Sequence, residues 1–161
     1  MDIVSNTVYE LGMKLKQSNM VLVTAESCTG GWVSKLITDV PGSSAWFDRG
    51  FITYSNNAKS DMLGVDRKII AEFGAVSEET VLAMTQGALA RSNGSIAIAT
   101  SGIAGPDGGS LNKPVGLVCF SWLQREKLQI TESKIFAGDR DEVRLKASTY
   151  VLEKLLALLS E

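Results

Sequence analysis

The sequence predicts an α/β protein, a three-layer α/β/α sandwich around a mixed sheet of about five strands. Three observations carry this prediction. Segments with helical spacing of apolar residues alternate with short apolar runs through the first hundred residues, and a hairpin-like pair of strands precedes the last helix. The chain of 161 residues, 45% of them hydrophobic, also has the size of one domain with one core. We therefore expect a single domain over residues 1–161.

The first four elements are expected to alternate helix and strand. Apolar residues spaced by three and four predict a helix over 7–17, and the branched apolar run 20–25 is typical of a buried strand. Helical spacing returns over 32–40, where a Pro-Gly pair ends the helix. Aromatic and branched residues favour a second strand over 45–54.

Three helices are expected next. Candidate capping residues at 55–57 open a short helix that stops at Gly64, and a second short helix over 66–73 is closed by a glycine. Ser77, followed by two glutamates, is typical of the N-cap of a longer helix that ends near 93–94.

The rest of the chain adds three strands and one helix. A buried strand over 96–101 leads into a glycine-rich loop, and strands over 115–124 and 128–136 flank a charged turn. The last helix has one apolar face and runs from near Asp139 to Ser160. Because ligands of open α/β sheets gather beyond the carboxyl ends of strands, the residues that follow each strand are the candidates for a site.

Charge and hydropathy argue against two classes of partner. Sixteen basic and eighteen acidic residues give a net charge of -2, without the basic block that neutralises phosphates along a nucleic acid. No run approaches the roughly 18 apolar residues that cross a bilayer, and the first residues lack the pattern of a secretory signal. We expect no nucleic-acid partner, no membrane partner and a cytoplasmic location.

The absence of histidine from the sequence limits the available chemistry. A Ser-His-Asp or Cys-His pair, and most zinc and iron sites, cannot be built from this chain. Cys28 and Cys119 lie 91 positions apart with no CxxC motif, so neither a metal site nor a disulfide framework is indicated. Both are expected to be reduced thiols.

The first candidate site is the segment 24–31, where a strand runs into hydroxyl residues and glycines and then into a helix. N–H groups at the start of a helix have no partner within it and favour an oxyanion or a phosphate. The segment is neither a Walker loop nor a GxGxxG motif. The alternative is structural: Ser27 or Thr29 caps the helix, and Gly30 and Gly31 permit a tight turn.

Lys59 is the second candidate. If Asn56 caps the helix, Lys59 falls in its first turn, where the positive end of the dipole disfavours a cation and lowers the lysine pKa. That is the direction which a neutral-amine base requires. The alternative is a solvated surface lysine, and for Tyr54, just before this helix, a packed aromatic residue is the alternative to a catalytic phenol.

Two further segments have the chemistry of a ligand site. Residues 101–109 contain four glycines and one proline, and such a loop can wrap a ligand with backbone donors. Arg140 and Arg144 are four apart and share one face of the last helix, and arginine suits phosphate through its planar fork. The alternatives are an ordinary reversing loop and ion pairs with the acidic residues at 139, 141 and 142.

A Ser–Lys pair is the route to acyl chemistry that these residues leave open. With no histidine, neutral Lys59 takes the hydroxyl proton of Ser27, which then attacks a carbonyl carbon. In this interpretation, N–H groups beside Gly30 and Gly31 hold the oxyanion.

Five motifs in one order resemble the CinA carboxy-terminal domain family. They are Thr24 to Gly31, Phe51 to Asn56 with Lys59, Gly74 to Glu78, Ser101 to Gly109 with Lys113 to Gly116, and Phe136 to Arg140. The likeness covers essentially the whole chain and is closest to the stand-alone nicotinamide-nucleotide amidases of the family. Many relatives carry an additional amino-terminal domain with a separate pyrophosphatase activity, which the resemblance does not extend to this chain.

The resemblance implies hydrolysis of the carboxamide of nicotinamide mononucleotide to nicotinate mononucleotide and ammonia, without cofactor or metal. It also implies an α/β/α fold and a homo-oligomer, for which a dimer is expected. By the family pattern Ser27 is the nucleophile, Lys59 its base and Tyr54 an aid to proton transfer. The nucleotide pocket is then lined by Thr29, Gly30, Gly31, Ser101, Gly102 and Arg140.

A second function stays open at this point. The same pocket suits a non-catalytic regulatory module that binds a pyridine nucleotide, in line with the competence and DNA-damage labels of the family. The pair Ser27 and Lys59 separates the two functions, because a binding module has no need of an activated hydroxyl.

Overall fold

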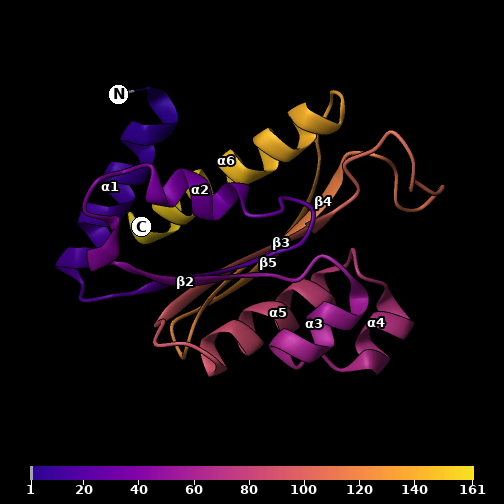
Figure 1. Ribbon diagram of the computed structural model, residues 1–161, viewed down its shortest axis with the longest axis horizontal. Helices are drawn as coiled ribbons and strands as arrows, with labels where there is room; N and C mark the ends of the chain where they lie inside the picture. The colour runs from indigo at the N-terminus through magenta and orange to yellow at the C-terminus, as the bar shows by residue number, and fades with distance from the viewer. Residues whose placement is uncertain (1) are drawn as a thin grey trace.

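A five-stranded sheet with the strand order β2-β1-β3-β4-β5 runs through the centre of the computed structural model, which describes residues 2–161 (Figure 1). β1 pairs in parallel with β2 and β3, whereas β4 is antiparallel to both β3 and β5. The strands are β1 (Leu22–Glu26), β2 (Phe47–Ile52), β3 (Ile96–Gly102), β4 (Leu117–Gln124) and β5 (Leu128–Ile135). The mixed sheet predicted from the sequence is confirmed.

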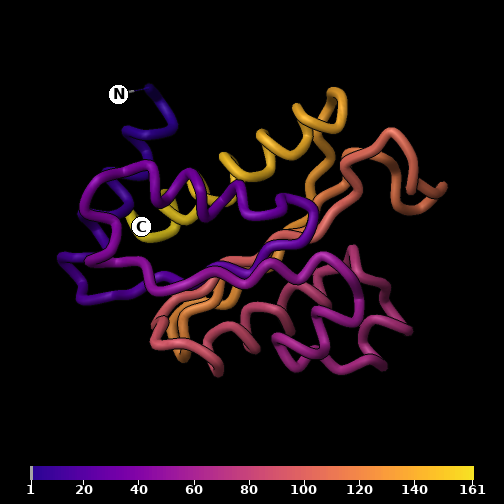
Figure 2. Tube along the Cα trace, in the orientation of Figure 1, coloured from indigo at the N-terminus to yellow at the C-terminus, as the bar shows by residue number. Residues whose placement is uncertain are grey.

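Helices cover both faces of this sheet (Figure 1). One layer consists of α1 (Ile3–Gln17), α2 (Trp32–Thr38) and α6 (Arg140–Leu159). The other consists of α3 (Asn56–Leu63), α4 (Arg67–Phe73) and α5 (Glu78–Ala90). Figure 2 shows that the segment between β3 and β4, residues 103–116, leaves the sheet as a long loop. The three-layer α/β/α architecture is therefore the one that the sequence predicts.

The sheet contributes to two hydrophobic cores because successive strand residues point to opposite faces. The side chains that face α1, α2 and α6 are mostly large, namely Leu22, Ile96, Ile98, Phe120 and Trp122. Those that face α5 are mostly smaller, namely Val23, Ala25, Ala97, Ala99 and Cys119. The same alternation governs the end of β1, where consecutive polar residues are directed into different layers.

A close helix–helix approach places α3 beside the end of the sheet. A Cβ atom on Gly87 of α5 would overlap the carbonyl oxygen of Leu63 in α3, so glycine is required for these two helices to come this near. The buried side chains of α3 are Lys59 and Leu63, one helical turn apart on the face that meets α5. Packing of α3 therefore directs Lys59 into the interior.

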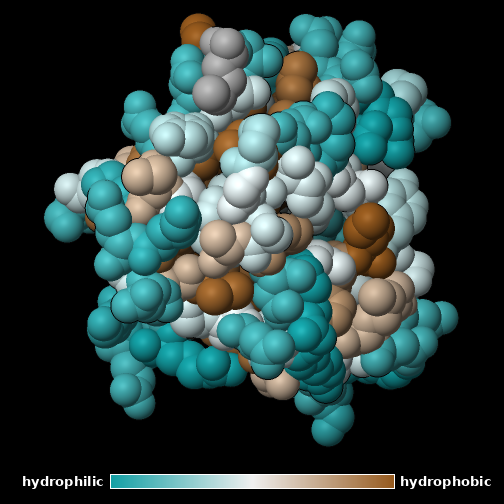
Figure 3. Space-filling view, turned by 60° about the vertical axis from the view of Figure 1, so that its left-hand side comes forward, coloured by the Kyte–Doolittle hydropathy of each residue, from teal (hydrophilic) through white to brown (hydrophobic). Residues whose placement is uncertain are grey.

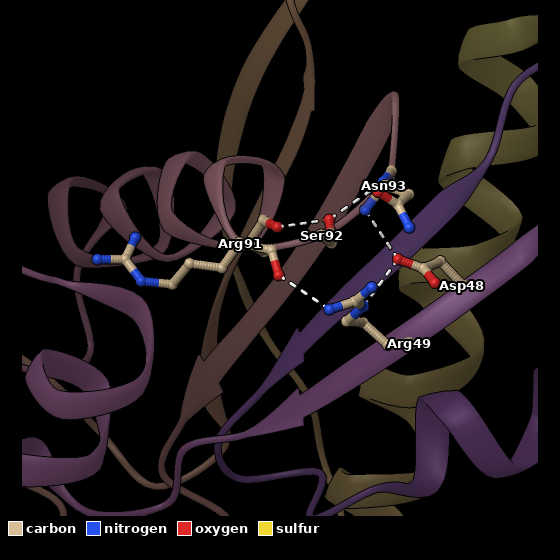
Figure 4. Close-up of polar contacts among 7 residues, drawn as sticks. Asp48, Arg49, Arg91, Ser92 and Asn93 are labelled. Carbon is tan, nitrogen blue, oxygen red and sulfur yellow. Dashed lines mark hydrogen bonds and ion pairs between the residues drawn. The ribbon is translucent and has the colours of Figure 1, made fainter.

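A polar cluster at the amino end of the sheet fastens the edge strand β2 to the turn between α5 and β3 (Figure 4). Asp48 accepts a hydrogen bond from the backbone N–H of Asn93 at 2.9 Å and one from Arg49 Nε at 2.8 Å. Arg49 also donates to the carbonyl oxygen of Arg91 at 3.2 Å. This cluster lies at the opposite end of the strands from the residues discussed below.

Two helix starts differ from the sequence-based expectation. The first helix begins four residues earlier than expected, at Ile3, because the side chain of Asp2 accepts the N–H of Ser5 and caps it. The cap of α3 is Ser55 rather than Asn56, so Lys59 is the fourth residue of that helix. Both differences reflect a short polar side chain that captures a free N–H one position or more before the apolar pattern begins.

The surface of the described residues gives two further observations. No helix within residues 2–161 combines the length and the apolar character needed to span a bilayer. On the face shown in Figure 3, hydrophobic side chains occur as separate spots among hydrophilic ones. The expected homo-oligomer stays a prediction.

Candidate active site

Ser27 and Lys59 meet beyond the carboxyl end of the sheet. Ser27 follows β1 and Lys59 lies in the helix that follows β2, the parallel neighbour of β1. Lys59 Nζ lies 2.9 Å from Ser27 Oγ, and the two residues are only 1% and 6% exposed. The structure therefore brings together the two residues that the sequence indicates as base and nucleophile.

Two backbone carbonyl groups fix the direction of the Lys59 amine. Lys59 Nζ donates to the carbonyl oxygen of Thr53 at 2.9 Å and to that of Tyr54 at 3.1 Å. A carbonyl oxygen only accepts, so each of them holds one N–H of the amine. When Lys59 is neutral, its two N–H bonds satisfy these carbonyls and its lone pair faces Ser27 Oγ. This is the orientation in which an amine can take a proton from the hydroxyl.

Burial lowers the pKa of Lys59 to about 8, because the ammonium form loses its hydration in the interior. Among residues 2–161, no carboxylate lies within 4.0 Å of its amine to stabilise the charge. A substantial fraction of Lys59 is thus neutral at mildly alkaline pH, as a general base requires.

Glu26, the last residue of β1, accepts hydrogen bonds from the first N–H groups of α2. Its two carboxylate oxygens accept five hydrogen bonds of 2.6–3.1 Å, from Thr29 Oγ1, the N–H groups of Gly31, Val33 and Ser34, and Ser34 Oγ. The N-cap residue of α2, Gly31, has no side chain to offer, and Glu26 takes that role from inside the sheet. The helix start is therefore already occupied by an internal anion.

N–H groups beside Gly30 and Gly31 are expected to hold an oxyanion, and the N–H groups of these two glycines themselves are not free to do so. The N–H of Gly30 donates to the carbonyl oxygen of Ser27 at 3.1 Å, and that of Gly31 donates to Glu26. The hydroxyl of Thr29 is buried between Glu26 and Thr100. These three residues shape the turn that carries Ser27.

A cavity of about 290 Å³ lies beside the Ser–Lys pair. Ser101, Gly102 and Arg140 line it, as do Tyr54 and residues 103–105, 107 and 108 of the glycine-rich loop. Thr29, Gly30 and Gly31 are not among its lining residues; the two glycines border a separate hollow on the surface. The structure thus brings six of the nine residues selected from the sequence to one cavity.

Arg140 closes one side of this cavity. Its guanidinium donates to the carbonyl oxygen of Gly105 at 2.8 Å and to the hydroxyl of Tyr54 at 3.3 Å. Within residues 2–161 it forms no ion pair, so the acidic neighbours on α6 do not neutralise it. Tyr54 reaches the Ser–Lys pair through its backbone carbonyl, while its exposed phenol ring lies at the cavity mouth with Arg140.

Arg144 lies on the far side of the same turn and does not line the cavity. Its Nε donates to the carbonyl oxygen of Cys28 at 3.0 Å, and its Nη2 donates to the carbonyl oxygen of Thr29 at 3.3 Å. Its guanidinium carbon lies 5.5 Å from the ring centroid of Trp32. The two arginines therefore have different contacts: Arg140 lines the cavity, and Arg144 binds the turn that follows β1.

Glu26 is the residue that sequence reasoning passed over. A signal for it exists, because a charged residue ending a fully buried strand needs internal partners, and the helix that follows begins with glycines that cannot cap it. Lys59 carries a comparable signal, since it shares the buried face of a short helix with Leu63.

Fold and site together define a class: an α/β/α protein that buries a serine–lysine pair against a cavity at the carboxyl ends of its strands. The chain matches the family model described as "CinA C-terminal domain" over residues 5–159. It belongs to the CinA C-terminal domain family.

Relatives within the family are close in sequence and in structure. The chain is 52% identical over 146 residues to "Nicotinamide-nucleotide amidohydrolase PncC" of Escherichia coli strain K12, covering 91% of this chain and 88% of that protein. It is 46% identical to the protein of the same name from Pseudomonas putida, over the full length of both. The crystal structure of competence/damage inducible protein CihA from Agrobacterium tumefaciens superposes with a TM-score of 0.94 at 41% identity, covering 100% of this chain and 98% of that one.

Proposed function

We propose that this protein is a nicotinamide-nucleotide amidohydrolase, which hydrolyses the carboxamide of nicotinamide mononucleotide to nicotinate mononucleotide and ammonia. Relatives at 52% and 46% identity carry that name. The single observation that supports the chemistry best is the 2.9 Å contact between Lys59 Nζ and Ser27 Oγ beside a cavity. The substrate is then a small nucleotide.

The proposed acylation step uses Ser27 as nucleophile and Lys59 as base. Ser27 Oγ bonds to the carboxamide carbon, its proton passes to neutral Lys59, and the carbonyl electron pair moves onto oxygen. When the carbonyl re-forms, the C–N bond breaks and the nitrogen takes the proton from Lys59 and leaves as ammonia. The product of this half-reaction is an ester of Ser27.

The deacylation step repeats the proton transfers with water. Water gives one proton to Lys59 as its oxygen bonds to the ester carbon, and Ser27 Oγ recovers that proton as it leaves. Because the amine must start neutral, kcat/KM is expected to fall about tenfold per pH unit below a pH of about 8, the pKa of Lys59.

Substrate binding is proposed for the residues that line the cavity. Ser101, Gly102 and Arg140 face it, and the guanidinium of Arg140, free of ion pairs within residues 2–161, suits the phosphate. We propose that Thr29, Gly30 and Gly31 act indirectly, by shaping the turn around Ser27. For Tyr54 the backbone carbonyl supports a role at the amine, and the part of its phenol in proton transfer stays a prediction.

The test is release of ammonia and of nicotinate mononucleotide from nicotinamide mononucleotide, with Ser27→Ala as the comparison. We expect turnover by the natural chain and a loss of several orders of magnitude in the variant, with nucleotide affinity largely kept. Tight binding without ammonia release by the natural chain would instead favour the regulatory module. Equal loss of turnover and binding in Ser27→Ala would count against a nucleophilic role.

A further inference from the structure

The amide reaction places a negative charge on the carboxamide oxygen, and the structure has to offer donors for it. The N–H groups first expected to serve, at Gly30 and Gly31, are engaged with Ser27 and Glu26. The donors must therefore come from elsewhere around Ser27. Two backbone N–H groups at the cavity satisfy the requirements.

The first is the N–H of Cys28, the residue after the nucleophile. The carbonyl oxygen of Ser27 is turned toward the N–H of Gly30, 3.1 Å away, and in a planar trans peptide the N–H points opposite to the carbonyl. The N–H of Cys28 therefore points away from Gly30. No backbone carbonyl within residues 2–161 accepts it, and Cys28 lines the cavity.

The second is the N–H of Gly102, at the end of β3. The next residue, Ile103, donates its N–H to Leu117 of β4 at 2.8 Å, and neighbouring residues of a strand direct their N–H groups to opposite sides. The N–H of Gly102 is thus directed toward β1. On that same side of β3, the backbone N–H of Ser27 donates to the carbonyl oxygen of Thr100 at 3.0 Å. Gly102 lines the cavity, and in the described part of the chain its N–H donates to no carbonyl of the turn that follows β1.

Arg144 controls the turn that carries the first of these donors. It holds the carbonyl groups of Cys28 and Thr29 at 3.0 and 3.3 Å from the side opposite the cavity. The carbonyl oxygen of Thr29 also accepts the N–H of Trp32 at 2.9 Å, so the carbonyl that depends on Arg144 is that of Cys28. With the Cys28 carbonyl fixed in that direction, the turn cannot rotate its oxygen toward the developing oxyanion, where it would repel the charge. A Cβ atom on Gly30 would lie 3.2 Å from the same guanidinium, which shows how closely Arg144 is seated on the turn.

We propose that the backbone N–H groups of Cys28 and Gly102 form the oxyanion site, and that Arg144 is the positioning residue that holds the turn in the productive orientation. This inference rests on the proposed amidase function. Arg144 touches neither the pair nor the cavity, so its effect is on the rate of the chemical step rather than on affinity.

The main experiment compares Arg144→Ala with the natural chain on nicotinamide mononucleotide and on its thioamide analogue. We expect kcat for the amide to fall by about 10- to 100-fold with KM within about threefold, since one oxyanion donor is worth roughly 10²–10³ in kcat. Sulfur accepts hydrogen bonds weakly, so the thioamide should lose less and the ratio of amide to thioamide rates should fall. Arg125→Ala, on the exposed turn between β4 and β5, is the matched control and should leave both rates unchanged.

Chemical rescue distinguishes loss of the positioning contact from a general disturbance of the structure. Arg144 borders a hollow of about 450 Å³ beside Trp32, so methylguanidinium can enter the space that the alanine variant opens. We expect it to restore kcat at least tenfold in Arg144→Ala and to leave the natural chain unchanged. Should Arg144→Ala not fold, Arg144→Lys keeps a charge over the turn and should show a smaller fall of the same ratio. A rise in KM with unchanged kcat, or a loss of kcat with an unchanged ratio, would overturn the inference.

An activated ester makes the outcome independent of the natural substrate. Acylation of Ser27 by p-nitrophenyl acetate also develops an oxyanion, and Arg144→Ala should slow it by a similar factor, with Ser27→Ala as the blank. If the natural chain is acylated but releases no ammonia from the nucleotide, the proposed function fails while the acylation rates still decide this inference. If Ser27 is acylated neither by the ester nor by the nucleotide, both are wrong.

Discussion

Two ionisable side chains are buried on either side of one turn, and their surroundings are opposite in kind. Glu26 and Lys59 are each 1% exposed. Glu26 receives five hydrogen-bond donors, three of them backbone N–H groups at the start of α2. Lys59 meets only neutral acceptors, the carbonyl oxygens of Thr53 and Tyr54 and the hydroxyl of Ser27. The first surroundings favour a charge, and the second disfavour one.

The contrast between these two surroundings shows that the fold places a stabilising group and a reactive group in different layers. A buried carboxylate with every lone pair occupied strengthens the structure, whereas a buried amine without a counter-ion weakens it and is left free to exchange a proton. Strand alternation makes the separation possible, because Glu26 at the end of β1 is directed into the α2 layer and the next residue, Ser27, into the α3 layer.

Lys59→Met is expected to have the largest effect, a loss of at least about 10³-fold in kcat, because within residues 2–161 Lys59 is the only side chain with a base in hydrogen-bonding contact with Ser27 Oγ. The measurement is steady-state ammonia release at pH 8. Lys68→Met, on an exposed position of α4, is the matched control and should keep full activity. Activity in Lys59→Met within tenfold of the natural chain would show that Lys59 is not the base.

Glu26→Gln is expected to cost about 2–4 kcal/mol of unfolding free energy, because the amide nitrogen of glutamine would face N–H donors where a carboxylate oxygen now accepts them. Denaturant unfolding at pH 7 measures it. Glu72→Gln, an exposed residue of α4, should stay within about 0.5 kcal/mol of the natural chain. An equal, small effect at both positions would mean that the carboxylate of Glu26 is not what holds the start of α2.

The pH dependence of stability should reveal the opposite character of Lys59. Its pKa is lowered from 10.5 to about 8 in the folded state, so between these two values the unfolded chain binds more protons and stability rises with pH. Relative to Lys59→Met, the natural chain should gain up to about 3 kcal/mol from pH 8 to pH 10.5. Unfolding free energies of both proteins across this range give the difference directly. A difference that stays flat would mean that Lys59 is not desolvated.

The sequence predicts the elements that carry Ser27 and Lys59, but it does not predict the role of Glu26. Apolar spacing, capping residues and glycines together are enough to place the strands and helices, and therefore to place Ser27 and Lys59 near the ends of their elements. Their proximity follows once β1 and β2 are neighbours, a pairing that no local pattern specifies. The role of Glu26 depends on which layer its side chain enters and on the lack of a capping side chain at Gly31. Both are properties of the assembled sheet, so spacing along the chain does not reveal them.

The different positions of Arg140 and Arg144 also depend on the assembled fold, so the sequence alone does not predict them. Four residues apart on one helix, they share a face, and the sequence leaves open whether Arg144 joins Arg140 at a phosphate. One helical turn of rise is enough to carry Arg144 past the cavity and onto the carbonyl groups of Cys28 and Thr29. Which side of the turn each arginine meets is set by how α6 crosses it.

The polar cluster at the amino end of the sheet provides the smallest effect and a reference for the two buried groups. Asp48 has its pKa lowered mainly by the N–H of Asn93, so its contribution to stability is present above the ordinary pKa of aspartate and is lost in acid. Asp48→Ala should cost about 1 kcal/mol at neutral pH, the usual net value of a single hydrogen bond, and should leave kcat and KM unchanged. Denaturant unfolding at pH 7 and pH 3 measures the cost and its disappearance. A change in kcat would mean that the hydrogen bonds of Asp48 at the start of β2 help to position Lys59 in the helix that follows this strand. The two ends of the sheet would then not act independently in stability and in catalysis.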